Sequence, residues 1–172
     1  MANERTGVIV FKRNPMTLVG PEVRVGDRAP DFALAANDLS TVSLKDSAGK
    51  VRLISVVPSL DTPVCDQQTR RFNQEAGALG PNVAILTVSM DLPFAQKRWC
   101  GAAGVERVQT LSDYKTHEFG KAYGVRIKEL GLLARSVFVV DKHDRVTYVE
   151  IVREVADHPN YEKAIAAAKK AL

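Results

Sequence analysis

The sequence has few residues of the kinds that hold metals or bind nucleotides. Its 172 residues include only two cysteines and three histidines. The histidines, His117, His143 and His158, show no ligand spacing with one another or with the cysteines, so we expect no metal site. A glycine-rich phosphate-binding loop is also absent, so we expect neither a nucleotide nor any other cofactor.

The two cysteines, Cys65 and Cys100, are far apart and form no Cys-x-x-Cys pair. In a reducing compartment, two such cysteines are more often catalytic or inert than a permanent disulfide. Each thiol therefore has two open readings, as a reactive group or as a small buried hydrophobic residue.

Long apolar runs are missing as well. No run approaches membrane-spanning length, and Val8–Phe11 is too short for the core of a signal peptide. We therefore expect a cytoplasmic protein without membrane contact. The formal net charge is +4, but lysine and arginine are scattered, so nucleic-acid binding is not expected.

The chain length suits one domain, which we expect to cover residues 1–172. Strand-like and helix-like segments alternate and are followed by a hairpin, a pattern that predicts an α/β fold with a mixed sheet covered on both faces. The expected strands are Thr6–Phe11 and Met16–Val19, which form an N-terminal hairpin, then Phe32–Ala36, Thr41–Leu44, Val51–Val57, Val83–Met90, Val108–Leu111, Ser136–Val140 and Val146–Val152. The expected helices run from Thr62 to a stop at Gly80, from Pro93 to Cys100 with Gly101 as the stop, over Thr116–Tyr123 and over Asn160–Leu172.

The stretch Pro58–Cys65 joins the strand Val51–Val57 to a helix. Pro58 ends the strand, and Thr62 followed by Pro63 is typical of an N-cap with proline at the first helical position. Cys65 is then the third helical residue, beside unpaired backbone N–H groups and the positive end of the helix dipole, which favours a thiolate. The hydroxyl of Thr62 lies on the same face of this turn, within reach of the sulfur and of a bound oxygen.

Each of these residues also has a simpler reading. Cys65 alone is compatible with a small buried hydrophobic residue, Thr62 with a plain cap, and Pro58 with a strand terminator, because such residues are common at strand-to-helix turns. Taken together, with the spacing Pro-x-x-x-Thr-x-x-Cys, these residues make the simpler interpretations less easy to accept, because a hydroxyl three residues before the thiol lies on the same face of the first turn.

This spacing matches a known signature. Pro58, Thr62 and Cys65 resemble the active-site motif of the peroxiredoxins, which are thiol-based peroxidases with a thioredoxin-like fold. The segment Met90–Gly101, with the sequence MDLPFAQKRWCG, resembles the bacterial thiol peroxidases among them, in which the cysteine corresponding to Cys100 is the resolving one. The resemblance extends over nearly the whole chain.

The resemblance implies a reaction cycle. Cys65 would attack hydrogen peroxide or an alkyl hydroperoxide and become a sulfenic acid, which Cys100 would convert to an intramolecular disulfide. It also implies that thioredoxin is the reductant and that the protein is a homodimer, neither of which composition or spacing indicates. Both cysteines are expected near helix ends, so a direct bridge requires local unwinding.

Arg135 and Pro58 complete the expected site. Family resemblance assigns Arg135 the contact with the peroxidatic sulfur and the substrate oxygens, and Pro58 would shield the site from water. Arg135 stands one residue before an apolar strand, and from the residues alone a solvated arginine at a strand edge is the more ordinary reading. For Cys100, the alternative is a buried spectator beside Trp99.

Two other functions remain open. A thioredoxin-fold disulfide oxidoreductase or redox sensor would exchange disulfides without destroying peroxide, although the missing Cys-x-x-Cys pair argues against it. A non-catalytic binding module on the same fold would show peroxide reactivity no higher than that of free cysteine.

Overall fold

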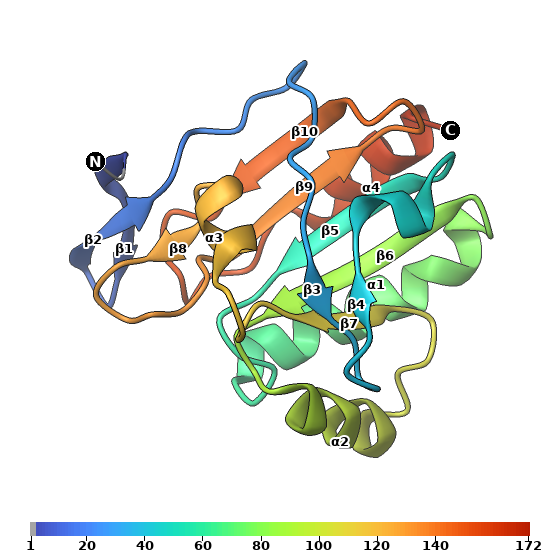
Figure 1. The fold of residues 1–172 in the computed structure, drawn as a ribbon, viewed down its shortest axis with the longest axis horizontal. Helices are drawn as coiled ribbons and strands as arrows, with labels where there is room; N and C mark the ends of the chain where they lie inside the picture. Colours follow the sequence, from blue (N-terminus) through green and yellow to red (C-terminus); the bar gives the residue numbers. More distant parts are fainter. Residues whose placement is uncertain (1–2) are drawn as a thin grey trace.

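The centre of the molecule is a seven-stranded mixed sheet with the order β10-β9-β5-β6-β7-β3-β4 (Figure 1). It is seen in a computed structural model that describes residues 3–172. The three central strands are parallel, namely β5 (Val51–Val56), β6 (Val83–Ser89) and β7 (Gln109–Ser112). The carboxyl ends of β5 and β6 therefore meet at the same edge of the sheet, where their following loops lie close together.

Antiparallel strands extend the sheet on both sides. On one side β9 (Ser136–Val140) pairs with β5, and β10 (Val146–Ile151) pairs with β9. On the other side are β3 (Leu34–Ala35) and β4 (Thr41–Val42). The predicted mixed sheet is therefore confirmed.

Helices and loop segments cover both faces of the sheet, as predicted. Helices α1 (Pro63–Leu79) and α4 (Tyr161–Lys170) pack on one face together with Trp99 of α2 (Pro93–Ala103). The short helix α3 (Glu118–Ala122) and the segment that leads into β3 cover the opposite face, in front of the sheet in Figure 1. Adjacent residues of β5 serve different cores, since Leu53 packs with α1 and α4 whereas Ile54 packs with α3.

The predicted N-terminal hairpin is also present. Strand β1 (Glu4–Phe11) pairs antiparallel with β2 (Asn14–Val19), and β8 (Arg126–Ile127) extends this pair to a three-stranded sheet. Sequence reasoning missed β8, because two residues carry no readable alternation. It also missed the short 3-10 helix η1 (Leu44–Ser47).

Several predicted boundaries were wrong. Helix α2 does not stop at Gly101 but continues to Ala103, and Gly104 ends it in the left-handed conformation, with φ of 64°. Helix α3 begins at Glu118 and not at Thr116, since His117 has φ of 58°, outside the helical region. The strands expected at 32–36 and 41–44 shorten to two residues each.

The described residues, 3–172, contain no helix that is long and apolar enough to cross a membrane.

A substitution at Gly20 tests how closely the hairpin packs against the rest of the chain. Gly20 has φ of 112°, and a Cβ there would overlap the carbonyl oxygen of Lys121. Gly7 has φ of 72°, but a Cβ added to it would meet no atom within 4 Å, so it serves as a control for backbone strain alone. In urea unfolding, Gly7→Ala should lower the free energy of unfolding by about 1 kcal/mol and Gly20→Ala by about 3 kcal/mol. Equal losses would contradict the steric account.

Candidate active site

Cys65 lies in the first turn of α1 and is fully buried. Thr62 occupies the N-cap position with extended backbone angles, and Pro63 is the first helical residue, so the predicted strand, turn and helix are confirmed. In the first turn, the backbone N–H groups have no intrahelical acceptor, and they point toward the entrance of the helix near the sulfur.

The Thr62 hydroxyl does not cap the helix. Its Oγ1 lies 2.7 Å from Sγ of Cys65 and 3.0 Å from the carbonyl oxygen of Ser59, and it makes no side-chain capping bond. Since a hydroxyl has one hydrogen, it donates to only one of these acceptors at a time. The sulfur is the acceptor of this hydrogen when it is a thiolate.

Strand pairing brings Arg135 to the same sulfur. Ser136, the first residue of β9, pairs with Val56 at the end of β5, so the preceding Arg135 lies beside the start of α1. Arg135 is 2% exposed, and its Nη2 lies 3.3 Å from Sγ of Cys65. A strand-edge arginine that the sequence would usually leave in solvent is therefore buried against the cysteine.

The rest of the Arg135 guanidinium is held by uncharged acceptors. Nη1 donates to Oε1 of Gln68 at 2.8 Å, and Nε donates to the carbonyl oxygen of Val155 at 2.9 Å. Gln68 is itself fixed, since its Nε2 donates to Oγ of Ser55 at 2.8 Å. Sequence reasoning missed Gln68, although it lies three residues after Cys65, and that spacing places the two on one helix face.

No carboxylate within 4.0 Å balances the charge of Arg135 among residues 3–172. Tyr161 is close to this region, but burial raises the pKa of its phenol, with the nearby Arg135 and Arg71 opposing the effect. The phenol therefore stays neutral near pH 7. A buried cation without a counter-charge is costly, and a Cys65 thiolate is the anion that the geometry offers.

Pro58, Thr62 and Arg135 also line a largely apolar cavity of about 260 Å³. The hairpin contributes Phe11, and Leu130 and Leu132 come from the loop before β9. Cys65 is fully buried and does not line the cavity, but Thr62 and Arg135, which both contact its sulfur, do line it. The cavity suits a small molecule with a polar end and an apolar body.

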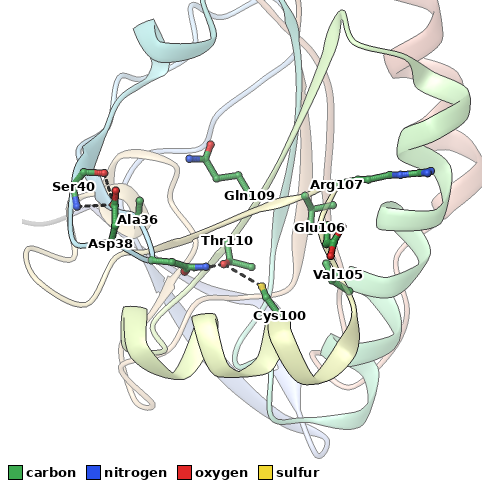
Figure 2. Close-up of a pocket in the computed structure, with 11 residues that line it drawn as sticks. Ala36, Asp38, Ser40, Cys100, Val105, Glu106, Arg107, Gln109 and Thr110 are labelled. Carbon is green, nitrogen blue, oxygen red and sulfur yellow. Dashed lines mark hydrogen bonds between the residues drawn. The ribbon is translucent and has the colours of Figure 1, made fainter.

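Cys100 lies apart from this group, on α2. Its sulfur is 3.5 Å from Oγ1 of Thr110, which donates to Oδ1 of Asn37 at 3.0 Å. Figure 2 shows Cys100 and Thr110 facing a second cavity, of about 550 Å³, whose lining is more polar. Both cysteines are free thiols, and residues 3–172 contain no hydrogen bond between them.

Trp99 and Asp66 join the helices that carry the two cysteines. Trp99 Nε1 donates to Oδ1 of Asp66 at 3.0 Å. Arg70 adds a bond from Nη1 to the carbonyl oxygen of Ala103 at 3.0 Å, and its guanidinium lies 5.7 Å from the Trp99 ring centroid. Asp66 directly follows Cys65 and Trp99 directly precedes Cys100, so these contacts connect the segments of α1 and α2 that carry the two cysteines.

Of the residues selected from the sequence, the structure thus brings Pro58, Thr62, Cys65 and Arg135 together. It leaves Cys100 in the neighbouring helix. Within residues 3–172, no group of three or more His, Cys, Asp or Glu side chains is arranged to hold a metal ion.

A buried cysteine at the start of a helix on a mixed sheet, with a hydroxyl and a guanidinium on its sulfur, defines a class of thiol redox proteins. A family model described as Redoxin matches residues 24–165. The chain is 66% identical over 164 residues to a thiol peroxidase of Halalkalibacterium halodurans, covering 95% of this chain and 98% of the relative. It is 61% identical over 161 residues to a thiol peroxidase of Bacillus subtilis, covering 94% of this chain and 96% of the relative. The chain belongs to the thiol peroxidase family of redoxins.

Solved structures agree with this assignment. A crystal structure of a peroxiredoxin-like protein from Aquifex aeolicus is 41% identical and has a TM-score of 0.90 over 99% of both chains. A thiol peroxidase from Chromobacterium violaceum is 20% identical, with a TM-score of 0.83 over 94% of this chain and 95% of that one, and supports the fold alone. The predicted thioredoxin-like fold with an N-terminal hairpin is confirmed.

The pairing of Arg135 with Cys65 makes a prediction about stability. If Cys65 is a thiolate that balances Arg135, Cys65→Ser leaves the buried guanidinium without a counter-charge, and the free energy of unfolding at pH 7 under reducing conditions should fall by about 3 kcal/mol. In an Arg135→Met background, the same substitution should cost much less, and a double-mutant cycle measures the difference. Additive effects of the two substitutions would show that the sulfur carries no charge that the arginine balances.

Proposed function

We propose that this protein is a thiol-dependent peroxidase in which Cys65 is the peroxidatic residue. The observation that carries the proposal is that Thr62 and Arg135 converge on one buried sulfur, with Oγ1 at 2.7 Å and Nη2 at 3.3 Å. Two donors on a single sulfur favour the thiolate, which is the nucleophilic form. They also stand where the charge of the reacting oxygens develops.

In the first step, the Cys65 thiolate attacks the terminal oxygen of a hydroperoxide. A sulfur–oxygen bond forms, the oxygen–oxygen bond breaks, and the leaving alkoxide or hydroxide takes a proton to become an alcohol or water. The sulfur loses two electrons and becomes a sulfenic acid. Arg135 and the amides of the first helical turn stabilise the departing negative charge, while Pro58 keeps water from the sulfur.

In the second step, Cys100 resolves the sulfenic acid. Its sulfur attacks the sulfur of Cys65, the sulfenic oxygen leaves as water, and a disulfide forms. Disulfide geometry requires the two Cα atoms to approach within about 7 Å, so the segments around Cys65 and Cys100 must leave their helical form. The contacts of Trp99 with Asp66 and of Arg70 with Ala103 are then lost.

The proposed substrate class and partners follow from the cavity and from the family. An apolar lining beside Thr62 and Arg135 suits the organic part of an alkyl hydroperoxide, and hydrogen peroxide fits the same site. A dithiol protein of the thioredoxin type supplies the two electrons that reduce the disulfide. We further propose that the protein acts in the cytoplasm as a homodimer.

Variants of the two cysteines test the cycle. Cys65→Ser should abolish peroxide turnover, because no thiolate remains beside Arg135. Cys100→Ser should consume one equivalent of peroxide and stop as a sulfenic acid, detected by mass spectrometry after trapping with dimedone. Full steady-state activity in either variant would overturn the cycle. In the wild type, fluorescence of Trp99 after mixing with one equivalent of hydroperoxide should change far faster than free cysteine oxidises, with loss of both thiols.

Disulfide formation should be visible as increased amide exchange. We expect hydrogen–deuterium exchange to rise on oxidation in the first turn of α1 and around Cys100 in α2, because backbone hydrogen bonds break there. Helix α4 provides an internal control, since it carries neither cysteine. Equal exchange in the reduced and oxidised protein would contradict the proposed unwinding.

A further inference from the structure

Asp91 lies in the loop between β6 and α2, and its carboxylate contacts the loop that precedes Cys65. Oδ1 accepts a hydrogen bond from Oγ of Ser59 at 2.7 Å, and Oδ2 accepts one from the backbone N–H of Leu60 at 2.8 Å. Oδ2 also accepts from Oγ of Ser89 at 2.7 Å. The parallel pairing of β5 with β6 explains this contact, since Val56 pairs with Val88 and both following loops leave the same edge of the sheet.

The carboxylate does not serve its own helix. An aspartate just before a helix usually accepts from the first helical N–H groups, but α2 has Leu92 at its N-cap and no side-chain capping bond. The carboxylate of Asp91 is directed instead to Ser59 and Leu60, which lie between Pro58 and Thr62.

Ser59 passes this constraint to the reactive sulfur. Its carbonyl oxygen is 3.0 Å from Oγ1 of Thr62, and that same hydroxyl is 2.7 Å from Sγ of Cys65. The position of the Ser59 backbone therefore affects where the Thr62 hydroxyl lies. It also affects whether this hydroxyl donates its hydrogen bond to the Ser59 carbonyl oxygen or to the Cys65 sulfur.

The same carboxylate is linked to the helix that carries Cys100. Gln96 of α2 is fully buried, and its Nε2 donates to Oγ of Ser89 at 3.0 Å, while Ser89 donates to Asp91. Through Ser89, the carboxylate of Asp91 thus connects α2 with the loop that precedes Thr62.

We propose that Asp91 is a positioning residue for peroxide reduction, which holds Ser59 and through it the Thr62 hydroxyl against the Cys65 sulfur. This inference rests on the proposed function. Asp91 touches neither the sulfur nor the cavity, so its effect is confined to the oxidation step. Reduction of the Cys65–Cys100 disulfide does not use the Thr62 hydroxyl in this position.

Asp91→Asn is the principal test. The asparagine amide has one acceptor oxygen, and its NH₂ group replaces the other carboxylate oxygen. It therefore cannot accept hydrogen bonds from both the Ser59 hydroxyl and the Leu60 backbone N–H in their present positions. The reduced protein is mixed rapidly with hydrogen peroxide, quenched in acid and alkylated, and the loss of the Cys65 thiol is followed by mass spectrometry. The oxidised protein is then reduced with dithiothreitol. We expect oxidation to slow about tenfold, with reduction by dithiothreitol unchanged within about twofold.

Asp61→Asn is the matched control. Asp61 lies in the same loop, but its side chain is 62% exposed and its ion pair is with Arg98 at 3.6 Å. This variant removes the same charge near Cys65 without disturbing Ser59, so both rates should stay close to wild type. A comparable loss of oxidation rate in Asp61→Asn would show that charge, and not positioning, explains the effect, and would overturn the proposal.

Ser59→Ala keeps the proposal testable if Asp91→Asn does not fold, because it removes the bond between Ser59 and Asp91 and, besides that, only the longer contact of the Asp61 backbone N–H with Oγ of Ser59 at 3.3 Å. It should slow oxidation selectively, and adding it to Asp91→Asn should cause little further loss. If the wild type reacts rapidly with peroxide, two results would overturn the role of Asp91 and leave the proposed function intact. One is equal slowing of oxidation and reduction, and the other is no slowing of oxidation in Asp91→Asn or in Ser59→Ala. A wild type no faster than free cysteine would overturn the proposed function as well.

Discussion

The contact between the guanidinium of Arg135 and the sulfur of Cys65 is the interaction on which the site depends. The guanidinium is buried, held by the neutral oxygens of Gln68 and Val155, and has no carboxylate partner within 4.0 Å among residues 3–172. A positive charge in this position is tolerable when a negative charge faces it. In the proposed reaction, a thiolate at Cys65 supplies this negative charge before substrate arrives, and the oxygens of the reacting peroxide supply it during the reaction.

The two cysteines are held under opposite demands. In the proposed cycle, peroxide reduction needs Cys65 in a formed helical turn, where Thr62 and Arg135 reach the sulfur, whereas resolution needs that turn to open toward Cys100. We expect the bond of Trp99 to Asp66 and the bond of Arg70 to the carbonyl oxygen of Ala103 to hold the reduced protein in the first state. These contacts are few and lie near the surface of α1 and α2, so they can be lost without disturbing the sheet beneath.

Sequence reasoning was most successful where the information was local. The strand before Pro58, the helix start at Thr62 and Pro63, and the N-terminal hairpin follow from propensity and from the restricted backbone of proline. The same reasoning misplaced the end of α2, since both Gly101 and Gly104 are able to end a helix and only the left-handed angle of Gly104 shows which one does. It proposed Arg135 from family resemblance alone, because nothing in its neighbours distinguishes it from the other basic residues.

The sequence by itself determined the reactive turn, since Pro58, Thr62 and Cys65 lie within eight positions and helix geometry places the last two on one face. The tertiary structure alone decided what surrounds the sulfur. The antiparallel pairing of β9 with β5 brings Arg135 to it across 70 residues, and the parallel pairing of β6 with β5 brings Asp91 to the loop before it. Strand register fixes these neighbours, and register depends on side-chain packing across the whole sheet, which no local stretch of sequence contains.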